Sequence, residues 1–148
     1  MLKQRLLEEC KAYVATRIDT ARQSMEDAQR SANEESKSSA GDKYETGRAM
    51  MQIERDKAAQ QLEEALKLKS VLDQLPIERV PDKIGLGSLV ITPGKKIFIS
   101  IGIGRLRVDN EEYLVVAPTS PLGKTLMGLK EKDQTTFQRE VITIKQVV

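Results

Sequence analysis

The chain has 148 residues, with 24 Lys and Arg against 22 Asp and Glu, so its formal net charge is +2. It contains no His and a single Cys, which excludes a His-dependent catalytic triad and an intrachain disulfide. The charges are too balanced for a protein that binds DNA mainly by neutralising phosphates. No apolar run is long enough to span a membrane, and the N-terminus lacks the layout of a signal peptide. We therefore expect a cytoplasmic protein made of one ordinary domain or two small ones.

Apolar residues recur every seven positions along the first half of the chain, which is the coiled-coil repeat. When the two series are paired in reverse order, the residue numbers of each pair add up to 79, as antiparallel pairing requires. The pattern predicts one helical hairpin over residues 1–75, with its turn at Ser39 and Ala40. The four pairs are Leu7 with Leu72, Val14 with Ala65, Ala21 with Ala58, and Ala28 with Met51.

Flanking positions widen this apolar seam. They are Cys10, Ile18, Met25 and Ala32 in the first helix and Gly47, Leu62, Leu68 and Leu75 in the second.

The stretch 33–47 is expected to form the tip of the hairpin. Its serines compete for backbone hydrogen bonds, Gly41 tolerates a left-handed conformation, and Asp42 or a preceding serine can cap the second helix. Helices of some 33 residues would reach on the order of 50 Å at about 1.5 Å per residue. A capped turn is enough for any hairpin, but few globular cores need an arm of this length. We therefore expect the function at the tip.

Helical periodicity stops after Leu75, and residues 76–82 are predicted to be a linker that contains Pro76 and Pro81. Residues 83–148 change to short segments rich in β-branched residues, separated by turns at Pro93-Gly94 and Asp109-Asn110. This pattern predicts a compact α+β domain. Its expected strands are Ser88–Thr92, Lys96–Gly102, Tyr113–Ala117 and Val141–Val147.

One short helix is predicted between the third and fourth of these strands. Ser120 is a natural N-cap, Pro121 fits the first helical turn and Gly128 fits the C-terminal exit.

The run from Val115 to Gly128, VVAPTSPLGKTLMG, is followed by the charged turn LKEKD. Together with the long hairpin and with Asp42-Lys43-Tyr44 at the start of its second helix, this run resembles the bacterial transcript-cleavage factors GreA and GreB. The resemblance covers essentially the whole chain. It implies an FKBP-like fold for the C-terminal domain, which would dock on the rim of the secondary channel of RNA polymerase. The tip of the hairpin would then reach toward the catalytic centre.

The resemblance also implies which residues bind the polymerase. In the C-terminal domain they are Ser120, Pro121, Leu122 and Lys124, and at the tip they are Ser39 and Tyr44.

In the Gre family, acidic tip residues help to hold the second Mg²⁺ of the polymerase, and carboxylate oxygens are the ligands that Mg²⁺ prefers. Counted back from Tyr44, the two key acidic positions of the family fall on Lys37 and Ala40 in this chain. The candidate tip carboxylates are instead Glu34, Glu35, Asp42 and Glu45.

Asp42 and Glu45 lie three residues apart and could share one helix face, which makes them the candidate ligands of a shared Mg²⁺. Their alternative role is to stabilise the N-terminus of the second helix with negative charge.

The resemblance thus predicts a regulator of RNA polymerase rather than an enzyme. It would have no cofactor of its own, no membrane partner and only indirect contact with RNA and DNA, and it would act as a monomer. It would either promote cleavage of backtracked RNA or merely occupy the channel.

Two alternatives belong to other classes. One is an FKBP-like peptidyl-prolyl isomerase or chaperone module with a helical arm, although only Phe98, Tyr113 and Phe137 could line an aromatic pocket. The other is an oligomerisation hairpin.

Overall fold

The computed structural model of the protein describes residues 2–37 and 42–148, with the side chains of residues 35–45 excepted. Two compact units divide the chain. The hairpin unit is Ala12–Lys69, and the β-rich unit combines the residues up to Lys11 with Ser70–Val148. None of the described helices is long and apolar enough to cross a membrane.

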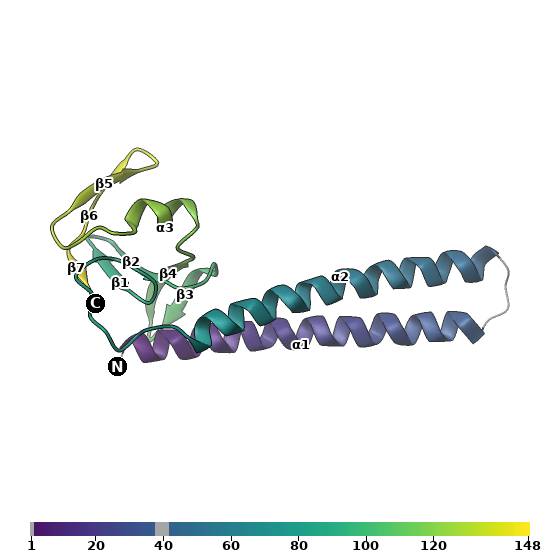
Figure 1. The fold of residues 1–148 in the computed structure, drawn as a ribbon. Coiled ribbons are helices and arrows are strands. Elements are labelled where there is room, and N and C mark those ends of the chain that lie inside the picture. The colour runs from purple at the N-terminus through teal and green to yellow at the C-terminus, as the bar shows by residue number, and fades with distance from the viewer. Residues whose placement is uncertain (1, 38–41) are drawn as a thin grey trace. The chain divides into compact units, whose positions relative to one another are not determined.

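Two long helices make up the first half of the chain (Figure 1). Helix α1 spans Leu2–Lys37 and helix α2 spans Asp42–Asp73. Helix α1 contains neither Gly nor Pro, which keeps its backbone hydrogen bonds uninterrupted over about 54 Å. Helix α2 ends with tightened turns, because Leu75 N donates to Leu72 O at 3.3 Å and Pro76 then stops the helix.

The predicted seam is buried. In the hairpin unit, Val14, Ala21, Ala58 and Ala65 are all 3% exposed or less. Ala28 is buried as well, and its predicted partner Met51 is half-buried. Burial at these seven-residue steps confirms the antiparallel hairpin, and the small Ala side chains allow the two helices to approach closely.

Most of the stretch 33–47 is helical. Helix α1 continues to Lys37, and α2 begins at Asp42, where the sequence predicts the cap of the second helix. The predicted turn at Ser39 and Ala40 lies outside the described residues.

A five-stranded sheet with the order β3-β4-β2-β1-β7 forms the centre of the β-rich unit. Strands β2 and β4 are parallel, and the other neighbours are antiparallel. A separate two-stranded ribbon pairs β5 with β6. The strands are β1 Leu89–Thr92, β2 Lys95–Ile99, β3 Gly104–Val108, β4 Glu111–Val116, β5 Gln134–Phe137, β6 Glu140–Thr143 and β7 Gln146–Val147.

Two-residue turns close three hairpins, one of them the predicted turn at Pro93-Gly94 between β1 and β2. Asp109 and Asn110 both have positive φ, 52° and 65°, which confirms the predicted turn and is typical of type I′. Gln138 and Arg139 form the equivalent turn between β5 and β6, with φ of 51° and 68°.

The predicted single strand Val141–Val147 is wrong, because the chain changes sheets within it. Ile144 N donates to Asp133 O at the end of the ribbon, and Lys145 N then donates to Ile91 O of β1. The segment is therefore divided into β6 and β7.

Both faces of the five-stranded sheet carry buried core residues. On one face Val90, Ile97 and Ile99 pack with Leu126 of helix α3 (Pro121–Leu126) and with Ile142 of the ribbon. The other face carries the row Leu89, Phe98 and Val115, which is at most 1% exposed.

We assign the first turns of α1 as the cover of this second face, because Leu6 and Cys10 are fully buried and the Cys10 thiol lies beside Ser100, directly after β2. Cys10, which the sequence predicts at the flank of the hairpin seam, therefore packs within the β-rich unit.

Candidate functional site

Helix α3 begins with a tightly fixed Ser-Pro step. The Ser120 Oγ accepts a hydrogen bond from Gly123 N at 3.0 Å and donates one to Ala117 O at 2.7 Å. Ser120 is thus the N-cap, and Pro121 occupies the first helical turn, as the sequence predicts. Gly128, with a φ of 83°, follows the helix at its exit.

Close packing requires Gly at position 123. A Cβ at this position would lie 2.1 Å from Ala117 O and 3.0 Å from Ser120 Oγ. The sequence shows this Gly only as part of Gly-Lys-Thr, and no local pattern reveals the neighbouring carbonyl.

The four candidate residues of α3 differ in exposure. Pro121 and Lys124 are exposed, and Ser120 is half-buried. Leu122 is 8% exposed and belongs to the core beneath the helix. Of the four candidates, Pro121 and Lys124 are therefore the accessible ones, and the Leu122 side chain anchors the helix from below.

The tip candidates are only partly described. Glu34 is exposed on α1. The side chains of Glu35, Asp42, Tyr44 and Glu45 lie outside the described residues, as does Ser39. Elsewhere in the chain, the described residues hold no group of three His, Cys, Asp or Glu side chains that could bind a metal ion. The proposed Mg²⁺ ligands Asp42 and Glu45 thus stay a prediction.

Helix α2 has an apolar pair on its outer surface. Met50 is 57% exposed and Ile53 is 65% exposed, one helical turn apart. Both positions lie off the seam, where the heptad pattern predicts polar side chains.

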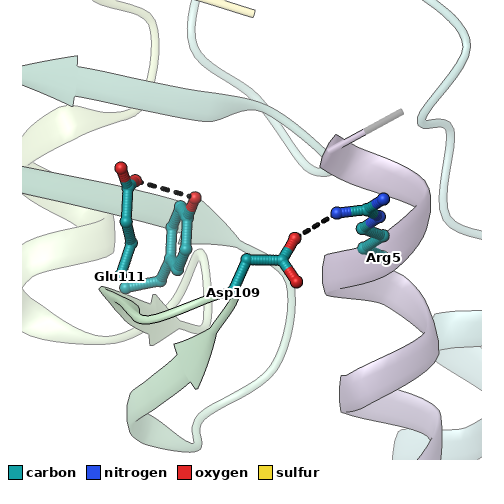
Figure 2. Close-up of polar contacts among 4 residues, drawn as sticks. Arg5, Asp109 and Glu111 are labelled. Carbon is teal, nitrogen blue, oxygen red and sulfur yellow. Dashed lines mark hydrogen bonds and ion pairs between the residues drawn. The ribbon is translucent and has the colours of Figure 1, made fainter.

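Three polar contacts in the β-rich unit connect the start of α1 to residues far along the chain. Arg5 forms an ion pair with Asp109 in the β3–β4 turn, although both side chains are more than half exposed (Figure 2). Lys3 Nζ donates to Arg79 O at 3.2 Å, and burial lowers the pKa of this ammonium group.

Cys10 is the third contact of this group. Its thiol lies beside the Ser100 hydroxyl, and burial raises the pKa of the thiol to about 11. The interpretation of Cys10 as a buried apolar residue is therefore confirmed.

A second polar cluster lies next to Asp109 and was not predicted. Lys96 pairs with Glu111, and this hydrogen bond raises the pKa of Lys96 and lowers that of Glu111. The Tyr113 hydroxyl donates to Glu111 Oε2 at 3.3 Å (Figure 2), and burial raises the pKa of Tyr113. The Lys96 ammonium lies 5.7 Å from the centre of the Tyr113 ring. The charges and hydrogen-bonding groups of these three residues are paired with one another, as expected of a cluster with a structural role.

Comparisons with known proteins give a likeness among solved structures. No protein-family model and no curated protein matches the chain. Among solved structures, the chain is similar to one described as the structure of the transcription factor Gfh1. The two sequences are 16% identical, and the match covers 93% of this chain and 92% of that one with a TM-score of 0.37.

Proposed function

We propose that the protein is a Gre-like transcription factor that binds RNA polymerase at its secondary channel. The β-rich domain would dock at the rim through α3, and the tip of the hairpin would reach toward the catalytic centre. The proposal rests on the resemblance of the Val115–Gly128 run and the hairpin to the Gre family.

The observation that supports this proposal most is the slender hairpin. The seam residues Val14 and Ala65 are 1% and 0% exposed, so each helix covers the apolar face of the other. A self-sufficient pair of helices, each on the order of 50 Å long, is suited to enter a narrow channel. The exposed pair Met50 and Ile53 gives this arm an apolar contact surface that its own packing does not use.

Docking is tested by a pulldown with core polymerase. We expect a complex at micromolar protein and low salt, and its absence would end the proposal. Lys124→Glu reverses the exposed charge of α3 and should weaken the complex. The control is Thr119→Glu, at an exposed position just before the N-cap, which also places a new carboxylate beside α3 but leaves Lys124 in place.

Insertion of the tip is tested by tethered hydroxyl-radical cleavage. An iron chelate is attached to Ser39→Cys in a Cys10→Ala background, and cuts are expected near the catalytic centre of the polymerase. The same chelate on Ser24→Cys, an exposed site in the middle of α1, should cut farther out. Equal cutting patterns from the two positions would exclude insertion tip-first.

The chemistry of the tip is tested separately. Stalled, backtracked complexes are incubated with wild type, Asp42→Ala and Glu45→Ala. If the two carboxylates share the Mg²⁺ of the polymerase, each substitution should reduce RNA cleavage while leaving the pulldown unchanged. A wild type that binds without stimulating cleavage would leave occupation of the channel as the function.

A further inference from the structure

Strand β3 forms one open edge of the five-stranded sheet. In the order β3-β4-β2-β1-β7 it has β4 on one side, and no described strand lies on the other. It is five residues long, contains no Pro and pairs with β4 in unbroken register from Gly104 to Val108. Natural edges are usually shortened, bulged, interrupted by Pro or lined with charged side chains. This edge carries two arginines and begins at Gly104 with a φ of 92°, and from Arg105 to Val108 its pairing with β4 is unbroken.

The hydrogen-bonding direction along β3 follows from two contacts of β4. Val116 O accepts from Ser100 N, so it points toward the β2 side, whereas Val115 O accepts from Ile103 N and points toward β3. Alternate residues of a strand point their backbone groups in opposite directions. Leu114 and Glu112 therefore point toward β2 and leave their partners Arg105 and Arg107 without bonds from β4. The N–H and C=O groups of both arginines point to the open edge.

The side chains of β3 alternate in character between the two faces of the sheet. Arg105 and Arg107 project on one face and are both exposed. Leu106 lies on the other face and is half-buried, with buried Val108 two residues further on. An added strand would place its side chains beside arginines on one face and beside Leu106 on the other.

Arg105 and Arg107 share the exposed face of this edge with one carboxylate, that of Glu112, so the edge itself carries a net positive charge. A hollow of about 370 Å³ adjoins Arg105, and the two lysines in its lining, Lys95 and Lys96, are paired with Glu140 and Glu111. Arg105 and Glu112 form an exposed pair at 3.4 Å. The complete lining is Gly94, Lys95, Lys96, Arg105, Glu112, Tyr113 and Leu114.

We propose that the open edge of β3 binds an extended segment of a partner protein in which acidic and apolar residues alternate. The segment adds a strand to the sheet through the backbone groups of Arg105 and Arg107. Its acidic side chains lie beside the two arginines, and its apolar side chains cover Leu106. A second copy of β3 is disfavoured, because it would bring four arginines to one edge.

The test uses the full ¹⁵N-labelled chain and a synthetic peptide of alternating Glu and Val. In the free protein, the amide protons of Arg105 and Arg107 should exchange rapidly with solvent, while that of Leu106, which points to β4, is protected. Saturating peptide should protect the first two and leave Leu106 unchanged. Rapid exchange of Arg105 and Arg107 in both states, or their protection in the free protein, would overturn the proposal.

Two matched variants separate backbone from charge. Arg105→Gln removes one charge and retains the outward N–H, and it should weaken the peptide by about two- to fivefold. Arg105→Pro removes the same charge and also the N–H, which β4 does not use, so it should fold and should bind more weakly than Arg105→Gln. Unchanged amide spectra outside β3 check that both variants are folded. Equal binding of the two variants would contradict strand addition.

The chemistry of the partner is tested with three further probes. A peptide of alternating Lys and Val should bind at least tenfold more weakly, and a single-stranded RNA oligonucleotide should not protect the β3 amides. Light scattering should give a mass that does not depend on concentration. A preference for the Lys peptide, protection by RNA or a concentration-dependent dimer through β3 would each replace the proposed partner with another class.

Discussion

Arg5 in the second turn of α1 forms an ion pair with Asp109, which stands 104 residues later in the β3–β4 turn. The contact connects the beginning of the chain to a hairpin of the sheet within the β-rich unit (Figure 2). Asp109 also forms part of the two-residue turn, where its backbone is left-handed with a φ of 52°. A single residue therefore maintains both a turn and a contact with α1.

Substitutions at the two partners should separate these roles. Arg5→Gln should lower the free energy of unfolding by less than about 1 kcal/mol, and by less still at high salt, because the pair is exposed. Asp109→Asn should match it, since Asn also tolerates left-handed backbone. Asp109→Ala should cost roughly 1–2 kcal/mol more than Asp109→Asn. Urea titrations measure all three, and an Asp109→Ala variant as stable as Asp109→Asn would contradict the role of the turn.

Gly123 offers a sharper test of packing. Gly123→Ala places a Cβ 2.1 Å from Ala117 O, a backbone atom that cannot move freely. We expect a loss of about 1–3 kcal/mol in the free energy of unfolding, because α3 must shift. Gly85→Ala is the control, since no atom lies within 4 Å of the added Cβ and the φ of Gly85 is not left-handed. It should be neutral or stabilising by up to about 1 kcal/mol. Equal costs in the two urea titrations would show that the close approach is unimportant.

The elements that could be predicted from sequence are those with a local repeat or a local cap. The seven-residue steps through Val14 and Ala65 predict the hairpin, because burial of one seam imposes that period on both helices. Ser120 and Pro121 predict α3, since the capping bond to Gly123 N spans only three residues. In both cases the information lies within a few turns of chain.

The missed elements depend on distant partners. Strand β3 reads GRLRV. Its two arginines stand where a strand buried on both faces would carry apolar residues, because one face of this edge is exposed. Strand β5 reads QTTF and belongs to a ribbon of two strands, which needs little apolar surface. The pairing of Arg5 with Asp109 has no local signature at all. Sequence patterns therefore predict buried elements better than edges and contacts.

Two buried or half-buried serines should respond oppositely to removal of the hydroxyl. Ser120→Ala loses the bonds to Gly123 N and Ala117 O and should cost about 1–2 kcal/mol. Ser100 is 2% exposed, and its Oγ lies beside the Cys10 thiol, a weak hydrogen-bonding group, but meets none of the described groups in hydrogen-bond geometry. Ser100→Ala should thus be neutral or stabilising. Chemical denaturation of both variants checks the contrast, and a large loss for Ser100→Ala would reveal a partner of this hydroxyl, such as a buried water.

The buried thiol of Cys10 should make stability fall at alkaline pH. Its pKa is raised by burial from 9.0 to about 11, so the unfolded chain loses this proton at lower pH than the folded one. The folded state is therefore favoured below pH 9, and this advantage is lost as the pH rises from 9 to about 11. The loss is on the order of 2 kcal/mol. Raised acidic groups such as Tyr113 act in the same direction, so the comparison with Cys10→Ala isolates the thiol.

Urea titrations at steps between pH 8 and 11 measure this difference. Cys10→Ala should be less stable than wild type at pH 8, because it leaves a small cavity, and the gap between the two should narrow as the pH rises. Reaction of the native thiol with a disulfide reagent should be slow and should accelerate in urea, since only the exposed thiolate attacks. Parallel stability curves for the two proteins across this range would show that the thiol is not desolvated, and with it that the stripe of α1 containing Cys10 does not cover the sheet.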